Sequence, residues 1–373
     1  MHILMPMRIG VPKEIKIQEY RVGLVPAAVR ELTSAGHNVL VQSGAGAGVG
    51  CTDEDYRSVG ATIAADAAAV FNDSELIVKV KEPQIAECAR LRRDQVLFTY
   101  LHLAADRPQT EALIKSQCVA IAYETVTAAD GSLPLLTPMS EVAGRMAVQI
   151  GAQYLQQGNG GCGVLLGGVP GVPSAKVVVI GAGVAGTNAL EMAHGLRAEV
   201  TAIDRSIQRL REIDVQFHGA VHTLFSTADS IERAVADADL LIGAVLIPGA
   251  TAPRVVTAAM IHRMRPGSVV VDIAIDQGGC IETSRPTTHA APTYTVDGVV
   301  HYCVTNMPGA VPRTSTFALN NATLPYVKAL ADKGWERATA EDRGLKAGLN
   351  VVRGTVVHPA VARALGLAAV ERN

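Results

Sequence analysis

Three glycines in this sequence have the spacing of a turn that binds phosphate groups. Gly181, Gly183 and Gly186 form the pattern G-x-G-x-x-G directly after the apolar run Lys176–Ile180, and a helix-like stretch follows. In such a turn the first glycine permits the tight bend, the second lets the backbone approach a pyrophosphate, and the third allows close packing of helix against strand. Amides at the start of the helix stabilise the phosphate charge. The pattern therefore predicts a dinucleotide site.

Asp204 ends the next apolar run and indicates which dinucleotide binds. A carboxylate at this place accepts hydrogen bonds from ribose hydroxyls and repels a 2′-phosphate, which favours NAD over NADP. Arg205 follows immediately and could instead bind the 2′-phosphate of NADP. The alternative to a dinucleotide site is a structural glycine turn that binds no nucleotide. A second glycine-rich stretch, Gly44–Gly50, does not fit the pattern in any frame, so we expect it to be a turn before a helix.

Basic side chains follow the apolar runs in the first third of the chain. Lys81 comes after Glu75–Val80, His102 comes after Val96–Leu101, and Arg21 lies in the charged loop after the first run. Ligands of an open parallel sheet lie beyond the carboxyl ends of its strands. Arg and Lys bind a carboxylate through charge-assisted hydrogen bonds, and His exchanges protons near neutral pH. We therefore expect a site for an oxo acid, although each residue alone also fits a solvated loop or a packed core.

Asp276 is the candidate residue at a strand end in the second half of the chain. It follows the apolar run that begins at Val269, and the two glycines after it let the chain turn near a ligand. We expect Asp276 to orient a water molecule or to assist His102, and we interpret Asp272 as structural. No zinc-protease, serine-hydrolase or P-loop motif is present, and we predict no metal site.

Short β-branched runs alternate with Ala- and Leu-rich stretches of helical period, which is typical of parallel βα units. We expect an α/β protein with two doubly wound parallel-sheet, Rossmann-like domains and a cleft between them. The expected strands are Arg8–Val11, Val39–Val41, Glu75–Val80, Val96–Leu101, Val119–Ala122, Lys176–Ile180, Glu199–Ile203, Leu240–Ala244, Ser268–Ile273 and Val299–Val304. A long helix, Glu141–Gln156, should cross between the domains, and a return helix is expected at Ala318–Asp332.

Composition narrows the function classes. The 373 residues are 49% hydrophobic and 18% charged, which excludes a disordered chain. The formal net charge is −2 and basic clusters are short, so we expect no nucleic-acid partner. Apolar runs are too short to span a membrane, and no secretory signal is readable. The six scattered cysteines suggest reduced thiols. We therefore predict a soluble, cytoplasmic protein.

Several motifs, in order along nearly the whole chain, resemble the bacterial L-alanine dehydrogenase family, which is related to the nucleotide-binding subunit of transhydrogenase. The motifs are Arg8-Ile-Gly-Val-Pro-Lys-Glu14, Glu19-Tyr-Arg-Val22, Lys79-Val-Lys-Glu-Pro83, Leu101-His-Leu-Ala-Ala105, Pro138-Met-Ser-Glu-Val-Ala-Gly-Arg145, Gly167-Gly-Val-Pro-Gly-Val172, Asp272-Ile-Ala-Ile-Asp-Gln-Gly-Gly279 and Ser284-Arg-Pro-Thr-Thr288. The resemblance implies NAD-dependent oxidative deamination of L-alanine to pyruvate and ammonia, and the reverse reductive amination.

The resemblance also implies roles for individual residues. Arg21 and Lys81 would bind the substrate carboxylate and carbonyl, His102 would transfer protons, and Asp276 would be the second catalytic residue. Besides the glycine turn and Asp204, the implied cofactor residues are Ser140, Val184, Arg209, Ser226, Val245, Leu246, Arg285, Asn306 and Met307. The implied domains are a substrate domain (1–138), an NAD-binding domain (139–310) and a return segment (311–373), with subunits assembled as a homohexamer.

There are two alternatives, of which the first shares this fold and the second shares the reaction type. A transhydrogenase subunit has no amino acid substrate and no need of Lys81 or His102. An opine or saccharopine dehydrogenase-like enzyme would need room for a longer amino acid. Cys162 stands where we expect a basic residue, and we have no functional account of it.

Overall fold

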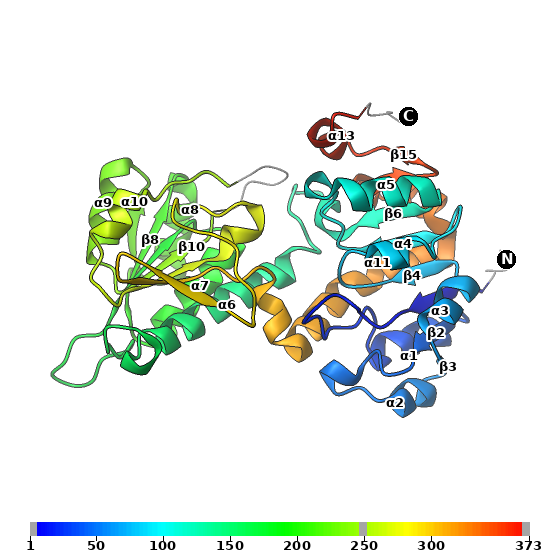
Figure 1. The fold of residues 1–373 in the computed structure, drawn as a ribbon, viewed down its shortest axis with the longest axis horizontal. Helices are drawn as coiled ribbons and strands as arrows, with labels where there is room; N and C mark the ends of the chain where they lie inside the picture. The colour runs from blue at the N-terminus through cyan, green and yellow to red at the C-terminus, as the bar shows by residue number, and fades with distance from the viewer. Residues whose placement is uncertain (1–5, 246–251, 368–373) are drawn as a thin grey trace. The chain divides into compact units, whose positions relative to one another are not determined.

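The computed structural model describes residues 6–245 and 252–367. The chain divides into two compact units (Figure 1). Unit 1 comprises Met1–Met139 and Val311–Asn373, and unit 2 comprises Ser140–Ala310. Each unit contains one sheet with helices packed against it.

Unit 1 contains an eight-stranded sheet in the order β15-β14-β6-β5-β4-β1-β2-β3. Its strands are β1 (Arg8–Val11), β2 (Asn38–Gln42), β3 (Thr62–Ala64), β4 (Leu76–Val78), β5 (Val96–Thr99), β6 (Val119–Ala122), β14 (Leu349–Val352) and β15 (Thr355–Val356). The first six pair in parallel, and β14 and β15 extend the sheet antiparallel. The carboxyl ends of β1, β4, β5 and β6 therefore share one edge.

The helices of unit 1 begin at residues that satisfy the free amides of a first turn. Thr52 caps α2 with a capping box, and Asp106 caps α5. The capping by Thr52 confirms that Gly44–Gly50 precedes a helix. The helices are α1 (Pro26–Ser34), α2 (Asp53–Ser58), α3 (Ala67–Asp73), α4 (Ile85–Cys88), α5 (Arg107–Ser116), α11 (Pro312–Glu341), α12 (Arg343–Ala347) and α13 (Pro359–Leu365). Short 3₁₀ turns are η1 (Ala47–Val49), η2 (Leu103–Ala105) and η3 (Tyr123–Thr125).

The return helix is longer than the predicted segment Ala318–Asp332. α11 consists of two helices that meet at Gly334, where φ is +72°. Glycine accepts this left-handed conformation without strain, so the chain bends there rather than ending. Asn320 fixes α11 to the rest of unit 1, because its side chain accepts from the amide of Val25 (2.8 Å) and donates to the carbonyl of Gly23 (3.1 Å).

Unit 2 contains a seven-stranded sheet in the order β12-β13-β11-β10-β7-β8-β9. Its strands are β7 (Lys176–Ile180), β8 (Glu199–Asp204), β9 (His222–Phe225), β10 (Leu240–Gly243), β11 (Val269–Asp272), β12 (Thr293–Val296) and β13 (Val299–Tyr302). Only the edge strand β12 pairs antiparallel among these described strands. The helices are α7 (Val184–Gly195), α8 (Ile207–Gln216), α9 (Ala228–Asp237) and α10 (Ala258–His262), with 3₁₀ turns η4 (Gln157–Asn159), η5 (Ile273–Gln277) and η6 (Met307–Ala310). Helix α6 (Thr137–Tyr154) contains the boundary between the units.

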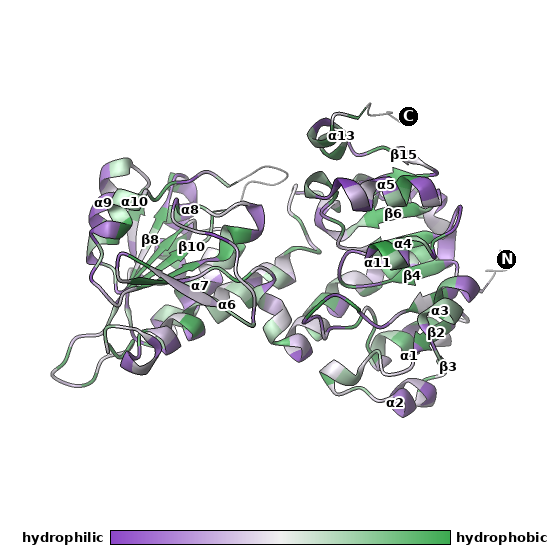
Figure 2. Ribbon diagram, in the orientation of Figure 1, coloured by the Kyte–Doolittle hydropathy of each residue, from purple (hydrophilic) through white to green (hydrophobic). Residues whose placement is uncertain are grey.

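Several strands inside the two sheets are buried along their whole length. Every residue of β4, β5, β6, β10 and β11 is buried, whereas three of the four residues of the edge strand β9 are exposed. Figure 2 shows hydrophobic strands and more hydrophilic outer helices in both units. Continuous apolar strands are typical of a parallel sheet covered on both faces. Two mostly parallel sheets with flanking helices confirm the predicted fold class; the antiparallel additions are short edge strands.

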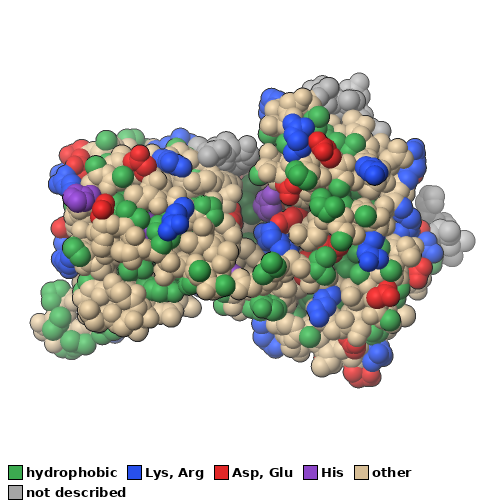
Figure 3. All heavy atoms as spheres, viewed as in Figure 1, with side chains coloured by type: hydrophobic (Ala, Val, Ile, Leu, Met, Phe, Trp, Pro, Cys, Tyr) green, Lys and Arg blue, Asp and Glu red, His purple; other side chains and the backbone are tan. Residues whose placement is uncertain are grey.

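Within the described ranges, no helix is both long and apolar enough to cross a membrane. On the face of the molecule in Figure 3, acidic and basic side chains are interspersed.

Candidate active site

The three basic candidates of unit 1 follow neighbouring strands at the same edge of the sheet. Arg21 lies in the loop after β1, Lys81 follows β4, and His102 follows β5. Because β1, β4 and β5 are consecutive and parallel, their carboxyl ends bring these side chains to one region. Tyr100 lies near two of them. Its ring stacks on that of His102 with centroids 5.9 Å apart, and the positive charge of Arg21 partly offsets the burial that raises the pKa of the Tyr100 phenol.

Arg21 is almost completely buried, with an exposed fraction of 2%. Its Nε and Nη2 atoms each donate to the carboxylate of Glu19 at 2.7 Å, and Nη1 lies 3.1 Å from the Met139 sulfur. Burial opposes the charge, but the hydrogen bonds and the negative charge of Glu19 raise the pKa of the guanidinium above its usual value. The arginine is thus held rigidly in its charged form. No sequence pattern identifies Glu19 as its partner.

The ammonium group of Lys81 makes few contacts with other side chains among the described residues. The side chain is 11% exposed, and Nζ lies 4.0 Å from the nearer oxygen of Glu82. Among the described residues Nζ makes no hydrogen bond, whereas the backbone carbonyl of Lys81 accepts from the Thr99 hydroxyl at 2.9 Å. The backbone is therefore held while the charge remains available to a ligand.

His102 adopts a left-handed backbone conformation, with φ +52° and ψ +37°. This conformation costs a non-glycine residue about 1–2 kcal/mol, so something must stabilise it. The carboxylate of Glu124 accepts from the His102 amide at 2.6 Å and from the Leu101 amide at 3.2 Å, and it lies 4.0 Å from His102 Nδ1. The imidazole is half-exposed, at 47%, which leaves it accessible for proton exchange.

Glu124 is a residue of this site that sequence reasoning missed. It follows β6, the next parallel strand of the sheet after β5. The rule that found Lys81 and His102, namely polar residues beyond the carboxyl end of a buried strand, would have found it too.

In unit 2 the glycine turn has the geometry that its pattern predicts. Gly181 has φ +94°, and a Cβ on Gly186 would lie 1.7 Å from the Gly181 carbonyl oxygen, so larger residues do not fit. A Cβ on Gly183 would meet nothing within 4 Å, and Gly183 caps α7 without a side-chain hydrogen bond. Open backbone at a helix N-terminus is a suitable place for a phosphate group. Val184, the first residue of α7, is exposed beside it.

Asp204, Arg209 and Ser226 surround this turn. The Asp204 carboxylate accepts from the amides of Ala182 and Ser206, both at 2.8 Å, and the amide of Ser226 donates to the Asp204 carbonyl at 3.0 Å. Arg209 Nε donates to the Ala182 carbonyl at 2.6 Å. The structure thus brings these three residues together at the ends of β8 and β9, and two of them brace the glycine turn.

Asp276 is exposed in η5, which follows β11. The loop is held by the buried carboxylate of Asp272, which accepts from the amides of Ala274 (3.1 Å) and Cys280 (3.1 Å), one on each side of Asp276. Burial raises the pKa of the Asp272 carboxyl. Val245 is half-buried after β10, which lies beside β11, while Leu246 lies outside the described residues.

Four further candidates lie on three segments of unit 2, with Asn306 and Met307 adjacent in the chain. Ser140 is in α6, and Met307 is buried in η6. The Arg285 guanidinium lies over the ring of Tyr294, 4.2 Å from its centroid. Asn306 has φ +62° and follows β13, the neighbour of β11. Asp276 and Asn306 follow adjacent parallel strands, β11 and β13.

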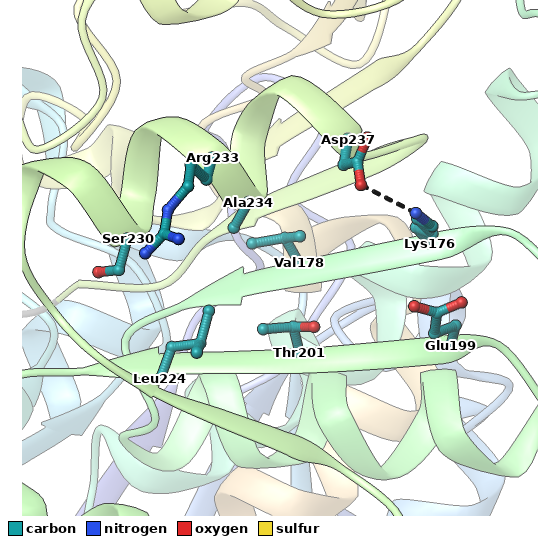
Figure 4. Close-up of a pocket in the computed structure, with 9 residues that line it drawn as sticks. All are labelled: Lys176, Val178, Glu199, Thr201, Leu224, Ser230, Arg233, Ala234 and Asp237. Carbon is teal, nitrogen blue, oxygen red and sulfur yellow. Dashed lines mark hydrogen bonds and ion pairs between the residues drawn. The ribbon is translucent and has the colours of Figure 1, made fainter.

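A groove of about 280 Å³ lies elsewhere in unit 2, on β7, β8, β9 and α9 (Figure 4). It is lined by Lys176, Val178, Glu199, Thr201, Leu224, Ser230, Arg233, Ala234 and Asp237. Lys176 and Glu199 are the first residues of their strands, so the groove extends to the amino ends of the sheet. None of the predicted site residues lines it. Within the described ranges, no group of three His, Cys, Asp or Glu residues could hold a metal ion.

Two glycine substitutions separate a packing role from a binding role. We expect Gly186→Ala to destabilise the protein by about 1–3 kcal/mol, because its methyl group has no space beside Gly181. Gly183→Ala should keep the unfolding temperature of the wild type, since Gly183 has an ordinary φ of −69° and open surroundings. It should nevertheless bind a dinucleotide about tenfold more weakly, because the methyl group lies where a phosphate would approach the amide. Thermal unfolding and titration with the dinucleotide measure both effects. Wild-type dinucleotide affinity in Gly183→Ala would show that the dinucleotide does not approach this amide.

Comparison with known proteins adds a full-length similarity. The family described as "Alanine dehydrogenase/PNT, N-terminal domain" matches residues 10–143, and "Alanine dehydrogenase/PNT, C-terminal domain" matches residues 147–359. An alanine dehydrogenase from Halomonas elongata is 60% identical over 98% of both chains. A solved structure of L-alanine dehydrogenase is 54% identical with a TM-score of 0.94, covering 96% of this chain and 99% of that one. A transhydrogenase structure from Sinorhizobium meliloti is 27% identical with a TM-score of 0.80, covering 95% and 99%.

Proposed function

The chain belongs to the alanine dehydrogenase/PNT family, and from this premise we propose which of its residues carry the chemistry. It is an oxidoreductase that deaminates L-alanine oxidatively to pyruvate and ammonia and catalyses the reverse reductive amination. The observation that carries this function is the similarity to alanine dehydrogenases over nearly the full length of the chain. The Halomonas elongata enzyme has 60% sequence identity. The transhydrogenase alternative is less well supported, at 27% identity, and no observation favours an opine or saccharopine dehydrogenase.

Unit 1 supplies the proposed substrate site. Lys81 has an ammonium group without a hydrogen bond among the described residues, and Arg21 is fixed in its charged form by Glu19. A small keto acid offers a carboxylate and a carbonyl oxygen, which are the acceptors that these two cations bind. Binding by these two cations orients the α-carbon, and such positioning contributes several kcal/mol in favourable cases, up to about 7–11 kcal/mol.

Unit 2 supplies the proposed cofactor site. Family and fold imply a nicotinamide cofactor, and we propose NAD because Asp204 ends β8 beside the glycine turn. The open amide region at Gly183 fits a pyrophosphate, and Val184, Arg209 and Ser226 lie around the same turn. The remaining proposed contacts are Ser140, Gly181, Gly186, Val245, Leu246, Arg285, Asn306 and Met307. When bound, the nicotinamide supplies the hydride acceptor of the oxidation.

The proposed proton chemistry uses His102 and Asp276. L-alanine loses a hydride from its α-carbon and a proton from its amino group, and water then adds to the resulting imine to release ammonia and pyruvate. His102 accepts and returns protons through its half-exposed imidazole, and Glu124 holds the His102 backbone. Asp276 is an acceptor that orients the attacking water. Overall, alanine, NAD⁺ and water give pyruvate, ammonium, NADH and a proton.

We also propose a homohexamer in the cytoplasm. The family resemblance supports the assembly, and the six cysteines, all free thiols, suit a reducing compartment.

An activity assay on the full chain tests the proposed function. We expect NADH to be consumed only when pyruvate and ammonium are both present, with no second protein, and we expect NADPH to react far more slowly because Asp204 repels its 2′-phosphate. A protein that passes hydride between NADH and a second nucleotide, without using pyruvate, would support the transhydrogenase alternative instead.

A further inference from the structure

A completely buried ion cluster lies directly beside the proposed substrate lysine. Lys79 Nζ donates to Glu14 at 2.9 Å and to Glu87 at 2.8 Å. The side chains are 0%, 2% and 4% exposed, respectively. Lys79 follows β4, Glu14 follows β1, and Glu87 lies in α4, so the cluster joins three segments below the edge that carries Lys81.

Stability alone is a weak explanation for such a cluster. Removing three charged groups from water carries a desolvation penalty that their mutual attraction often only balances. A well-packed apolar set of similar volume would commonly be as stable. The cluster also holds two carboxylates for one ammonium, so the second carboxylate is not required for neutralising Lys79. This suggests a role in addition to packing.

Glu14 also holds the backbone of the segment that ends in Lys81. Its Oε1 atom accepts from the Val80 amide at 2.7 Å and lies 3.4 Å from the Lys81 amide, while Oε2 binds Lys79. The Tyr123 hydroxyl donates to the Lys79 carbonyl at 2.9 Å. Hydrogen bonds thus fix the Lys79 ammonium, the Lys79 carbonyl and the Val80 amide. The hydrogen bond from Thr99 fixes the Lys81 carbonyl.

The direction of the Lys81 side chain depends on this backbone. Its ammonium has only the 4.0 Å contact with Glu82 and, among the described residues, no hydrogen bond that could hold it from the outer end. We propose that Glu14, held by Lys79, is a positioning residue that places Lys81 for the carboxylate of the keto acid. This inference rests on the proposed function, because it assigns Glu14 an effect that passes through Lys81.

Two isosteric substitutions test the proposal as a matched pair. Glu14→Gln and Glu87→Gln each remove one carboxylate charge and leave Lys79 with one anionic partner, so both variants should fold. Only Glu14 binds the Val80 amide and lies near the Lys81 amide, whereas Glu87 binds the amide of Gln84. We expect the KM for pyruvate to rise about tenfold in Glu14→Gln, the usual effect of losing a charged hydrogen bond, and to change less than about twofold in Glu87→Gln. NADH affinity should stay at the wild-type value in both.

A double-mutant cycle distinguishes positioning from a general structural effect. In a Lys81→Met background, Glu14→Gln should change the pyruvate KM by less than about twofold, because the group that it positions is gone. A tenfold effect that persists in that background, or equal effects of Glu14→Gln and Glu87→Gln, overturns the proposal. If Lys81→Met alone leaves the pyruvate KM unchanged, the proposed role of Lys81 fails first, and the positioning role fails with it.

A conservative variant covers the case in which Glu14→Gln does not accumulate as folded protein. Glu14→Asp keeps the charge but shortens the side chain by one methylene, so its carboxylate can no longer bridge Lys79 and the Val80 amide as Glu14 does. It should raise the pyruvate KM in the same direction, with NADH affinity unchanged. A wild-type pyruvate KM in folded Glu14→Asp contradicts the proposal.

Discussion

His102→Ala reduces alanine oxidation by about 10²–10⁴-fold in our account, the usual contribution of a general acid–base residue, while NADH binding stays close to wild type. The imidazole is the half-exposed proton-transfer group at the carboxyl edge of unit 1, whereas the glycine turn lies in unit 2. Steady-state rates with alanine and NAD, combined with NADH fluorescence titration, measure both quantities.

His218 provides a matched control. It is also an exposed histidine with a left-handed backbone, at φ +52°, but it lies in a turn of unit 2 after α8. His218→Ala should have the same small backbone consequence as His102→Ala and should retain wild-type turnover. If His102→Ala kept most of its alanine oxidation, the assignment of His102 would be rejected.

Lys81→Met has the second largest expected effect. We expect kcat/KM for pyruvate to fall roughly 30-fold to several-thousand-fold, because a buried charge partner of the carboxylate is removed. This fall corresponds to a loss of about 2–5 kcal/mol of transition-state stabilisation. Methionine keeps most of the apolar stem, so packing should change little. Reductive amination rates at varied pyruvate and saturating NADH and ammonium measure the effect.

Lys16 serves as the comparison residue for this prediction. It forms an ion pair with Glu82, the same carboxylate that lies 4.0 Å from Lys81. Lys16→Met therefore removes a neighbouring positive charge that contacts the same carboxylate. We expect kcat/KM for pyruvate to remain within about twofold of wild type. Equal losses in both variants would indicate a general electrostatic effect rather than a specific contact by Lys81.

The sequence was sufficient to predict the sheets and the edges at which their polar residues gather. Buried strands such as β4 and β5 are apolar runs, and Lys81 and His102 lie in the loops after them, so their placement depends on local pattern and parallel topology. The glycine turn is equally local, because its constraints act between Gly181 and Gly186. Short edge strands such as β12 and β15 have too few residues for a distinct pattern.

The contacts of the supporting carboxylates could not be predicted in the same way, although Glu124 itself follows a buried strand. Glu14 reaches Lys79, and Glu124 reaches His102, across strands that are distant in the sequence. Glu19 is only two residues from Arg21, yet its bidentate contact depends on how the loop folds. These contacts arise from tertiary packing, which a periodicity does not specify. The structure shows Cys162 bonded through its amide to the Gly267 carbonyl and suggests no function for it.

A crystal structure of the full chain with NADH and pyruvate would show directly which side chains bind the keto acid. We expect the pyruvate carboxylate at hydrogen-bonding distance, about 2.7–3.2 Å, from Lys81 Nζ, with Arg21 and His102 against the same molecule. Pyruvate bound away from these three side chains, for example in the groove on β7, β8 and β9, would contradict it.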